Sequence, residues 1–388
     1  MVKILIHGAT VLTLSLTDEP VIREGYVYIS DGRITAVGKG EPPEELKYPE
    51  LLINGRGRLV MPGLSAPLTS VTLYPLRYAL RGFAWDEVRD FLTTLTRTDV
   101  YYLACAAFQE MMLRGVTSAL ITDIYLDSVA RAARDAGIYV ALAPPFGWGL
   151  DDFGVENELR LLTGRWHERV EEVRAAVLGV GDAGISLAAD QAIKYGLTLY
   201  ALEADEESVS RAVDKGVKKV IRVNPRSEGV KQAIYYGEGL KLWRPGSGLG
   251  LGVEPSYSMI GVIERASRLS GSHPLDALYS ATVTNPSLIG HGWLGGIEVG
   301  RRANVVMLNT WEPPGWPAPR NLPSIVRAVV NGGLRVETVI VGDNVLVDAG
   351  ESMTLGYEVM SKVRSRFDKD VVKYYDSFGV KSGRQTEK

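Results

Sequence analysis

The sequence has few of the residues that usually hold metal ions or form disulfides. Its 388 residues include one cysteine and four histidines. The single Cys105 excludes a disulfide or a thiolate metal cluster within one chain, and it favours a reducing compartment. An excess of positive charge is also absent, because the formal net charge is -3 and the sequence pI is about 6.0. We therefore expect no nucleic-acid partner, since no polycation is available to neutralise phosphates.

Long apolar runs are missing as well. No run is long enough to span a bilayer, so we expect no membrane partner. The stretch MVKILIHGATVLTL alternates like a strand and lacks the pattern of a signal peptide, which predicts a cytoplasmic protein. What remains is an ordinary composition, with 46% hydrophobic and 23% charged residues. That balance is typical of a globular protein with a substantial buried core.

Short alternating segments at both chain ends indicate β-strands. In the first block, Asp31 and Gly32 mark a two-residue hairpin between alternating strands. A similar texture returns in ANVVMLN, SIVRAVVNGG and RVETVIVGDNVLVDAG. Neither block is large enough for a good sandwich alone. We therefore predict one composite β-sandwich domain built from residues 1–61 and 300–350.

Between these blocks, short apolar runs alternate with longer helical stretches. This alternation predicts a parallel sheet, and eight units predict a closed barrel. The fold class is thus α/β, a distorted (β/α)8 TIM barrel over residues 62–299 with the small β domain beside it. Residues 351–388 are expected to form a C-terminal amphipathic helix and a tail. The eight predicted barrel strands are 58–71, 116–122, 138–145, 173–181, 196–203, 218–225, 239–243 and 249–254.

Two segments resemble the amidohydrolase superfamily, in particular its chlorohydrolase and aminohydrolase branch. They are RLVMPGLSAPLTSV at 58–71 and HPLDALYSATVTNPSLIGHGWLGGIEVGRRANVVML at 273–308. The resemblance covers nearly the whole chain and implies one or two divalent metals in the barrel mouth, usually held by histidines. Such a metal lowers the pKa of its bound water to near 7 and supplies hydroxide for hydrolysis.

The positions that the resemblance assigns to the histidine ligands hold other residues. The His-x-His pair of the first strand falls on Leu68 and Ser70, and the fifth-strand histidine falls on Tyr200. The sixth-strand histidine falls at or near Arg222, which shares one strand face with Asn224. The register between these two stays open. None of the chain's four histidines has the paired spacing of a metal site.

Three carboxylates remain at predicted strand ends, where a barrel has its active face. Glu203 keeps the family's glutamate, Glu254 stands where the family often has aspartate, and Asp123 follows the second strand. If catalysis remains, Glu203 and Glu254 are the residual candidates. We further hypothesise that Arg222 pairs with Glu254 or Glu203 and occupies the space of the metal.

These residues predict a degenerate, metal-free hydrolase that is retained for small-molecule binding or for a partner role. One alternative is an active hydrolase of carbon–nitrogen bonds in a cyclic amide or amidine, with one divalent metal ion or a carboxylate-only site. Another is a structural subunit of an oligomer, either with itself or with a histidine-bearing paralogue. The expected pocket is lined by Leu68, Ser70, Asp123, Tyr200, Arg222 and Asn224.

Overall fold

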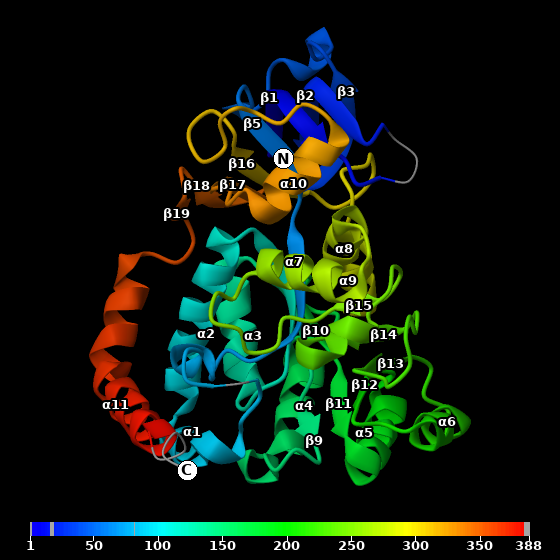
Figure 1. Cartoon of the computed structure of the whole chain (residues 1–388), viewed down its shortest axis with the longest axis vertical. Helices are drawn as coiled ribbons and strands as arrows, with labels where there is room; N and C mark the ends of the chain where they lie inside the picture. Colours follow the sequence, from blue (N-terminus) through cyan, green and yellow to red (C-terminus); the bar gives the residue numbers. More distant parts are fainter. Residues whose placement is uncertain (1, 16–18, 81, 384–388) are drawn as a thin grey trace.

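The computed structural model describes residues 2–15, 19–80 and 82–383, with side chains described as far as Asp376. Strands from both chain ends lie together at one end of the molecule (Figure 1). The barrel occupies the middle, and a long helix runs down one side. The tail expected after that helix, residues 384–388, lies outside the described residues.

The strands of the two chain ends form one sheet of nine strands. β1 pairs with β2, β4 and β5, and β5 continues antiparallel to β16. Alternation along these strands places Ile4, Ile6 and Val305 in one buried apolar cluster. A β domain built from both ends was predicted, and eight of the strands are joined by hydrogen bonds in one path, with β4 paired to β1 beside it. Their bounds are β1 Lys3–Leu12, β2 Val21–Ser30, β3 Arg33–Lys39, β4 Leu51–Asn54, β5 Arg58–Pro62, β16 Asn304–Asn309, β17 Val336–Val341, β18 Asn344–Asp348 and β19 Glu351–Ser352.

The hairpin between β2 and β3 turns at Asp31 and Gly32. Their φ angles are 52° and 68°, as a two-residue hairpin turn of type I′ requires. The segment SIVRAVVNGG, in contrast, was wrongly predicted as a strand and forms most of helix α10, Leu322–Asn331. Asn321 and Ser324 cap this helix reciprocally, and its buried residues recur with helical rather than alternating spacing.

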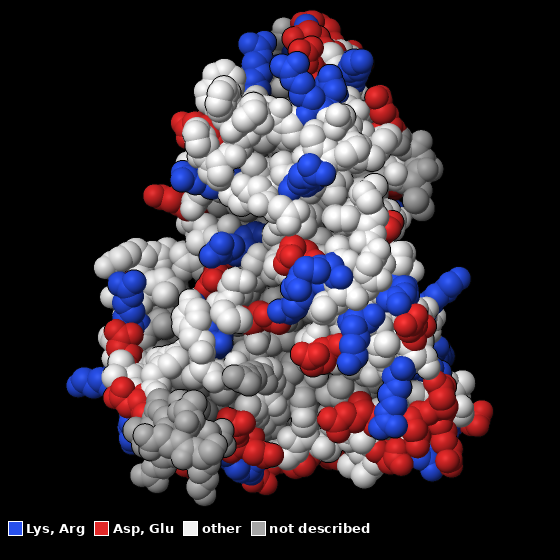
Figure 2. All heavy atoms as spheres, in the orientation of Figure 1, with Lys and Arg blue, Asp and Glu red and all other residues white. Residues whose placement is uncertain are grey.

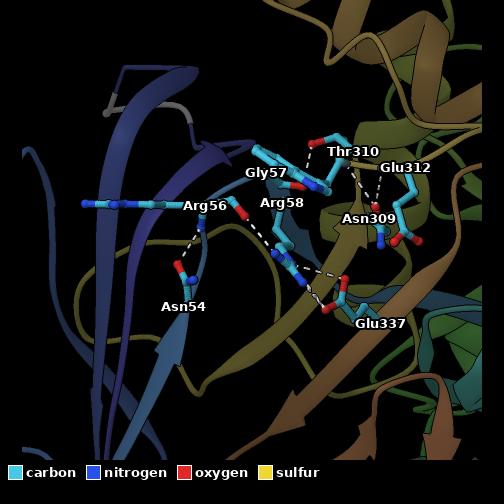
Figure 3. A network of polar contacts seen from close by, with 9 residues as sticks. Asn54, Arg56, Gly57, Arg58, Asn309, Thr310, Glu312 and Glu337 are labelled. Carbon is cyan, nitrogen blue, oxygen red and sulfur yellow. Dashed lines mark hydrogen bonds and ion pairs between the residues drawn. The ribbon is translucent and has the colours of Figure 1, made fainter.

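An ion pair ties β17 to β5 across the intervening strand β16 (Figure 3). Nη2 of Arg58 lies 2.6 Å from Oε1 of Glu337, and Nε donates to both carboxylate oxygens at 3.1 Å. Two bonded nitrogens fix the geometry of the pair. Glu337 is therefore fully engaged inside the sheet.

The chain passes from the β-sheet to the barrel at Gly63. A Cβ at this position would lie 2.2 Å from Oδ1 of Asn304 and 2.3 Å from Oγ1 of Thr117, so only glycine fits. The predicted strand 58–71 is therefore two strands, one on each side of this residue.

Parallel strands in the middle of the chain form two sheets, ordered β10-β8-β7-β6 and β15-β14-β13-β12-β11-β9. Two backbone hydrogen bonds of 2.8 Å link the chain after β15 to β6, from Leu251 N to Pro67 O and from Gly252 N to Leu68 O. This arrangement is that of a distorted barrel. The strand bounds are β6 Leu64–Thr69, β7 Val116–Ile121, β8 Tyr139–Leu142, β9 Pro145–Phe146, β10 Val173–Ala175, β11 Val177–Val180, β12 Leu199–Leu202, β13 Val220–Val223, β14 Ala233–Tyr235 and β15 Gly248–Leu249.

The strand predicted at 239–243 is wrong. That segment belongs to a 3₁₀ helix, Gly237–Leu242, and the barrel strand lies earlier, at β14. Gly237 has a φ of 55°, which ends the extended conformation directly after Tyr236. The short run AIY carries the strand, and too few residues alternate there for the pattern to be visible.

Helices follow most barrel strands, and α2 shows why they begin where they do. Thr96 and Asp99 form a reciprocal capping box at its start, which satisfies two otherwise free backbone N–H groups. The α-helices not yet bounded are α1 Arg89–Thr94, α2 Arg97–Leu113, α3 Leu126–Ala136, α4 Val155–Arg165, α5 Gly181–Tyr195, α6 Glu206–Asp214, α7 Met259–Ser270, α8 Pro274–Tyr279, α9 Asn285–Leu288 and α11 Tyr357–Gly383.

The terminal helix α11 lies along α2 (Figure 1). Nε of Arg366 donates to Oδ1 of Asp99 at 2.7 Å, so the cap of α2 also anchors α11. This agrees with the helix predicted for the C-terminal segment. Within the described residues, no helix has the length and apolarity that a membrane crossing requires.

Candidate functional site at the barrel mouth

The interior of the barrel is apolar up to its mouth. Leu68, at the end of β6, is fully buried although its φ of 55° is unusual for a leucine. It packs in a cluster, here called the inner cluster, to which nearly every barrel strand contributes. The cluster includes Leu68, Leu120, Ala141, Leu178, Tyr200, Leu202, Ile221, Val223 and Ile234. An apolar wall of this kind opposes the hydration of an ion.

Asp123 is the buried carboxylate of the site, with 2% of its surface exposed. Oδ2 accepts hydrogen bonds from Ser70 Oγ at 2.7 Å, Val71 N at 2.8 Å and Thr72 N at 3.0 Å. Oδ1 accepts from Thr72 Oγ1 and, at 2.8 Å, from Ile124 N.

Burial raises the pKa of Asp123, and these donors oppose that rise. Both oxygens are therefore occupied. The side chain locks the loop after β6 to the end of β7.

Tyr200 fills the position of the fifth-strand histidine. Its ring is buried in the inner cluster, and its hydroxyl donates to the carbonyl oxygen of Leu288 at 2.9 Å. Burial raises the pKa of the phenol well above its usual value. A neutral phenol engaged in this way is a wall of the barrel and a poor metal ligand.

The two candidate catalytic carboxylates do not meet in one cation-holding group. Glu254 binds Arg265 of α7, with Nη1 of the arginine 3.2 Å from Oε2 and Nη2 against Oε1. Glu203, which follows β12, has a φ of 55° and an exposed side chain. Within the described residues, no hydrogen bond or ion pair involves the side chain of Glu203. It is thus the free carboxylate of the rim.

Arg222 does not pair with Glu203 or Glu254, so this hypothesis is wrong. Its Nη1 lies 2.6 Å from Oε1 of Glu206, at the start of α6. The reason is strand alternation: Ile221 and Val223 belong to the inner cluster, which leaves Arg222 on the outer face. Asn224 instead bonds the backbone of Tyr236, accepting from its N–H at 2.8 Å and donating to its oxygen at 3.2 Å.

Aromatic rings lie over the inner cluster. Phe83, Trp148 and Tyr236 all pack against it. The ring centroids of Phe83 and Trp148 are 5.0 Å apart, those of Phe83 and Tyr236 are 5.9 Å apart, and Trp85 packs edge-on against Trp148 at 5.8 Å. We call these four residues the aromatic cover.

Beside the aromatic cover is a small cavity of about 150 Å³, lined by Phe83, Trp85, Trp148, Asp86 and Glu87 among others. Nε1 of Trp85 is buried without a hydrogen-bond partner. A volume of this size accommodates a single aromatic ring.

No family model matches the chain. A curated 5'-deoxyadenosine deaminase of Methanosarcina barkeri is 31% identical over 153 residues, which are 37% of this chain and 33% of that protein. The match thus spans about a third of that relative. A 5-methylthioadenosine/S-adenosylhomocysteine deaminase of Desulforamulus reducens aligns over 94% of this chain and 98% of its own length at 24% identity.

Solved structures agree in fold. An adenosine deaminase from Xanthomonas campestris with bound zinc has a TM-score of 0.76 at 15% identity, over 98% of this chain and 99% of that one. An atrazine chlorohydrolase from Arthrobacter aurescens, complexed with zinc, has a TM-score of 0.72 at 18% identity, over 93% and 99%. The chain belongs to the amidohydrolase superfamily. The predicted resemblance and the predicted barrel fold are therefore confirmed.

The relatives favour a different activity from the one predicted first. They are deaminases, so this superfamily membership favours the alternative of an active carbon–nitrogen hydrolase. It gives no support to the prediction of an inactive member. The zinc in two neighbours likewise favours the alternative of one divalent metal ion.

The side chains at the mouth do not fit the divalent metal that the amidohydrolase superfamily implies. Leu68 has no donor atom, the hydroxyl of Tyr200 is engaged, and both oxygens of Asp123 are occupied. Within the described residues, no three His, Cys, Asp or Glu side chains are grouped to hold a metal ion. Glu203 offers free oxygens, but it is a single ligand, and a stable site needs several.

Sequence reasoning found the strand-end positions but missed their partners. Phe83, Trp85, Trp148 and Tyr236 carry no motif. Phe153, in the segment after Trp148, packs against Tyr125 instead, with ring centroids 6.1 Å apart. The segment RGFAWDEV at 81–88 could have indicated the aromatic cover, because two aromatic residues follow a strand-end motif there.

Proposed function

We propose that this amidohydrolase-superfamily barrel binds a small planar heterocycle under its aromatic cover and does not carry out metal-dependent hydrolysis. The strongest support is that the polar groups at the mouth are already bonded to other groups of the protein. Ser70 and Asp123 bond each other, Glu254 bonds Arg265, and Tyr200 bonds a backbone carbonyl. None of these groups can replace the metal in lowering the pKa of a bound water.

The chemistry of the small cavity suggests the ligand class. Phe83 and Trp148 offer faces and edges for a flat ring. The unpartnered Nε1–H of Trp85 calls for an acceptor such as a ring nitrogen. Asp86 and Glu87, which are exposed, accept hydrogen bonds from an exocyclic amino group. An amino-triazine has all three features, and its single ring matches the volume of the cavity.

Binding is tested by calorimetric titration of melamine, with adenine and guanine as two-ring comparisons that should bind more weakly. We expect melamine to bind, and Trp148→Ala to weaken that binding about tenfold or more, since stacking on an aromatic side chain contributes about 1–3 kcal/mol. Phe153→Ala is the matched control, because Phe153 lies in the following segment but packs against Tyr125. Binding unchanged by Trp148→Ala contradicts the proposed position.

The second candidate is the active carbon–nitrogen hydrolase that the relatives favour. Deamination of an amino-heterocycle would use the same cavity, with Glu203 as proton shuttle and an atypical metal ion. Elemental analysis of protein purified without chelators and an ammonia-release assay separate the two candidates. Stoichiometric zinc, manganese, iron or nickel together with turnover would establish the hydrolase. Ring binding without metal or ammonia release supports the first proposal.

A further inference from the structure

A second cavity, larger than the one beside the aromatic cover, lies away from the barrel mouth. It has a volume of about 820 Å³ and is lined by residues of α2, the β-sheet, α7, α10 and α11. We call it the α2 cleft. Its floor is apolar and comes from β5, β6, β16, β17 and the end of α2, with Met61, Leu64, Leu113, Val306, Leu334 and Val336 as examples. The volume is that of a small-molecule site.

One carboxylate lines the cleft, and it is already neutralised. Oε2 of Glu110 accepts a 2.6 Å hydrogen bond from the hydroxyl of Tyr74 and a 3.2 Å contact from Nη2 of Arg77. Burial, followed by this hydrogen bond to Glu110, raises the pKa of Tyr74, so the phenol stays protonated as donor. Glu110 lies one helical turn before Arg114 and would form an ion pair with it if Tyr74 and Arg77 did not engage it.

The next carboxylate along the rim is also taken. Glu337 follows Arg335 by two residues, and it is held by both nitrogens of Arg58 (Figure 3). Arg58 engages both carboxylate oxygens of Glu337, so Glu337 is not available to pair with Arg335. The acidic residues beside the cleft are thus engaged elsewhere.

Two arginines of the cleft remain without a charge partner. Among the described residues, neither Arg114 nor Arg335 takes part in an ion pair or a side-chain hydrogen bond. Both side chains are exposed at the cleft. The residues that follow them in the chain lie close together, because a Cβ on Gly115 would lie 3.6 Å from Cγ2 of Val336. Two guanidinium groups therefore extend from neighbouring points above an apolar floor.

We propose that the α2 cleft binds a small amphipathic carboxylate, with its acid group at Arg114 and Arg335 and its hydrocarbon part on the apolar floor. A guanidinium suits a carboxylate because its N–H groups match both oxygens. The cleft begins at the amino-terminal ends of β6 and β7, whereas barrel enzymes act at the opposite face. This site is therefore independent of the activity at the mouth.

The test is calorimetric titration of the whole chain with sodium decanoate, compared with 1-decanol. We expect one decanoate per chain and binding of decanol at least about tenfold weaker. Arg114→Ala/Arg335→Ala should weaken decanoate about tenfold or more, because hydrogen bonds to charged groups are the strong ones. Arg327→Ala is the matched control, since Arg327 is an exposed arginine of α10 outside this cleft.

A second variant tests the apolar part of the site. Leu334 is half-buried in the cleft, and Leu334→Trp replaces it with a larger side chain. This variant should bind decanoate more weakly while its circular dichroism spectrum is unchanged. No measurable decanoate binding by the parent chain would overturn the proposal. Equal binding of decanoate by the double arginine variant, or of decanol by the parent chain, would overturn the role of the two arginines.

Discussion

The barrel mouth and the α2 cleft lie at the two ends of β6 and satisfy their charged groups in opposite ways. At the mouth, Asp123 accepts five hydrogen bonds from the protein and Glu254 has its own arginine. In the cleft, no ion pair or side-chain hydrogen bond among the described residues involves Arg114 or Arg335, while Glu110 and Glu337 are both paired. A site that binds a ligand needs unfilled hydrogen-bonding capacity. On that criterion, Asp123 and Glu254 at the mouth have little capacity left, so a ligand there depends on the aromatic cover, whereas the two arginines of the cleft keep theirs.

The difference predicts the largest effect for Asp123→Ala. The change leaves two hydroxyls and three backbone N–H groups of the mouth without their acceptor in a buried place. We expect a loss of about 4 kcal/mol in the free energy of unfolding, measured by urea denaturation. Asp348→Ala, at an exposed aspartate of β18, is the control and should change it by less than about 0.5 kcal/mol. A loss below 1 kcal/mol for Asp123→Ala would show that the network is not a structural lock.

Leu68→Ala addresses the apolar part of the mouth. Removing a fully buried leucine leaves a cavity among the inner cluster, and we expect a loss of about 3 kcal/mol in urea denaturation. Decanoate affinity at the α2 cleft should stay the same. A parallel loss of both would mean that the two ends of the strand are coupled rather than independent.

His291 offers a third case, a buried imidazole that no side chain of the described residues engages by a hydrogen bond. The ring sits edge-to-face between Tyr139 and Trp293. Burial lowers the pKa of His291 to about 3; the backbone of Val140 opposes this shift, and Arg174 adds to it.

The unfolded chain therefore binds a proton below about pH 6.5 that the folded chain does not. The contribution of His291 to the free energy of unfolding is fully present above about pH 6.5. It falls by up to about 1.4 kcal/mol per pH unit as the pH drops towards 3. Urea denaturation at a series of pH values measures this slope. His291→Phe should make the dependence shallower by that amount, and an unchanged slope would place the cause elsewhere.

The smallest effect is expected for the arginines of the cleft. Because their side chains make no ion pair or hydrogen bond among the described residues, Arg114→Ala/Arg335→Ala should change the free energy of unfolding by about 0.5 kcal/mol or less. Part of that change comes from Arg114 at the carboxyl end of α2, where a cation is favourable. A loss above 2 kcal/mol in the same denaturation assay would show that the arginines serve the fold instead of a ligand.

Alternation and short apolar runs predicted the composite sheet and most barrel strands, because those patterns record which face is buried. They failed at 239–243 and at 324–333. In the first case a three-residue strand is too short to alternate, and in the second the buried face of a capped helix is made of β-branched residues. At the site, the positions of Leu68, Ser70 and Tyr200 were readable from the resemblance.

The partners of the charged residues were not readable. Glu254 and Arg222 pair with Arg265 and Glu206, which lie on helices after the strands. Such pairs depend on the distance between a helix and a strand end, and a strand motif carries no information about it. Figure 2 shows acidic side chains gathered over α6, a surface feature that net charge alone could not locate.

The pairing of β5 with β16 has a consequence for synthesis on the ribosome. Roughly 240 residues separate Pro62 from Asn304, so the amino-terminal strands emerge long before the neighbour that covers their edge. At about 5–20 residues per second, that edge stays open for about 10–50 seconds. During this interval the nascent chain presents an unpaired strand to its surroundings, which makes it a natural substrate for a chaperone.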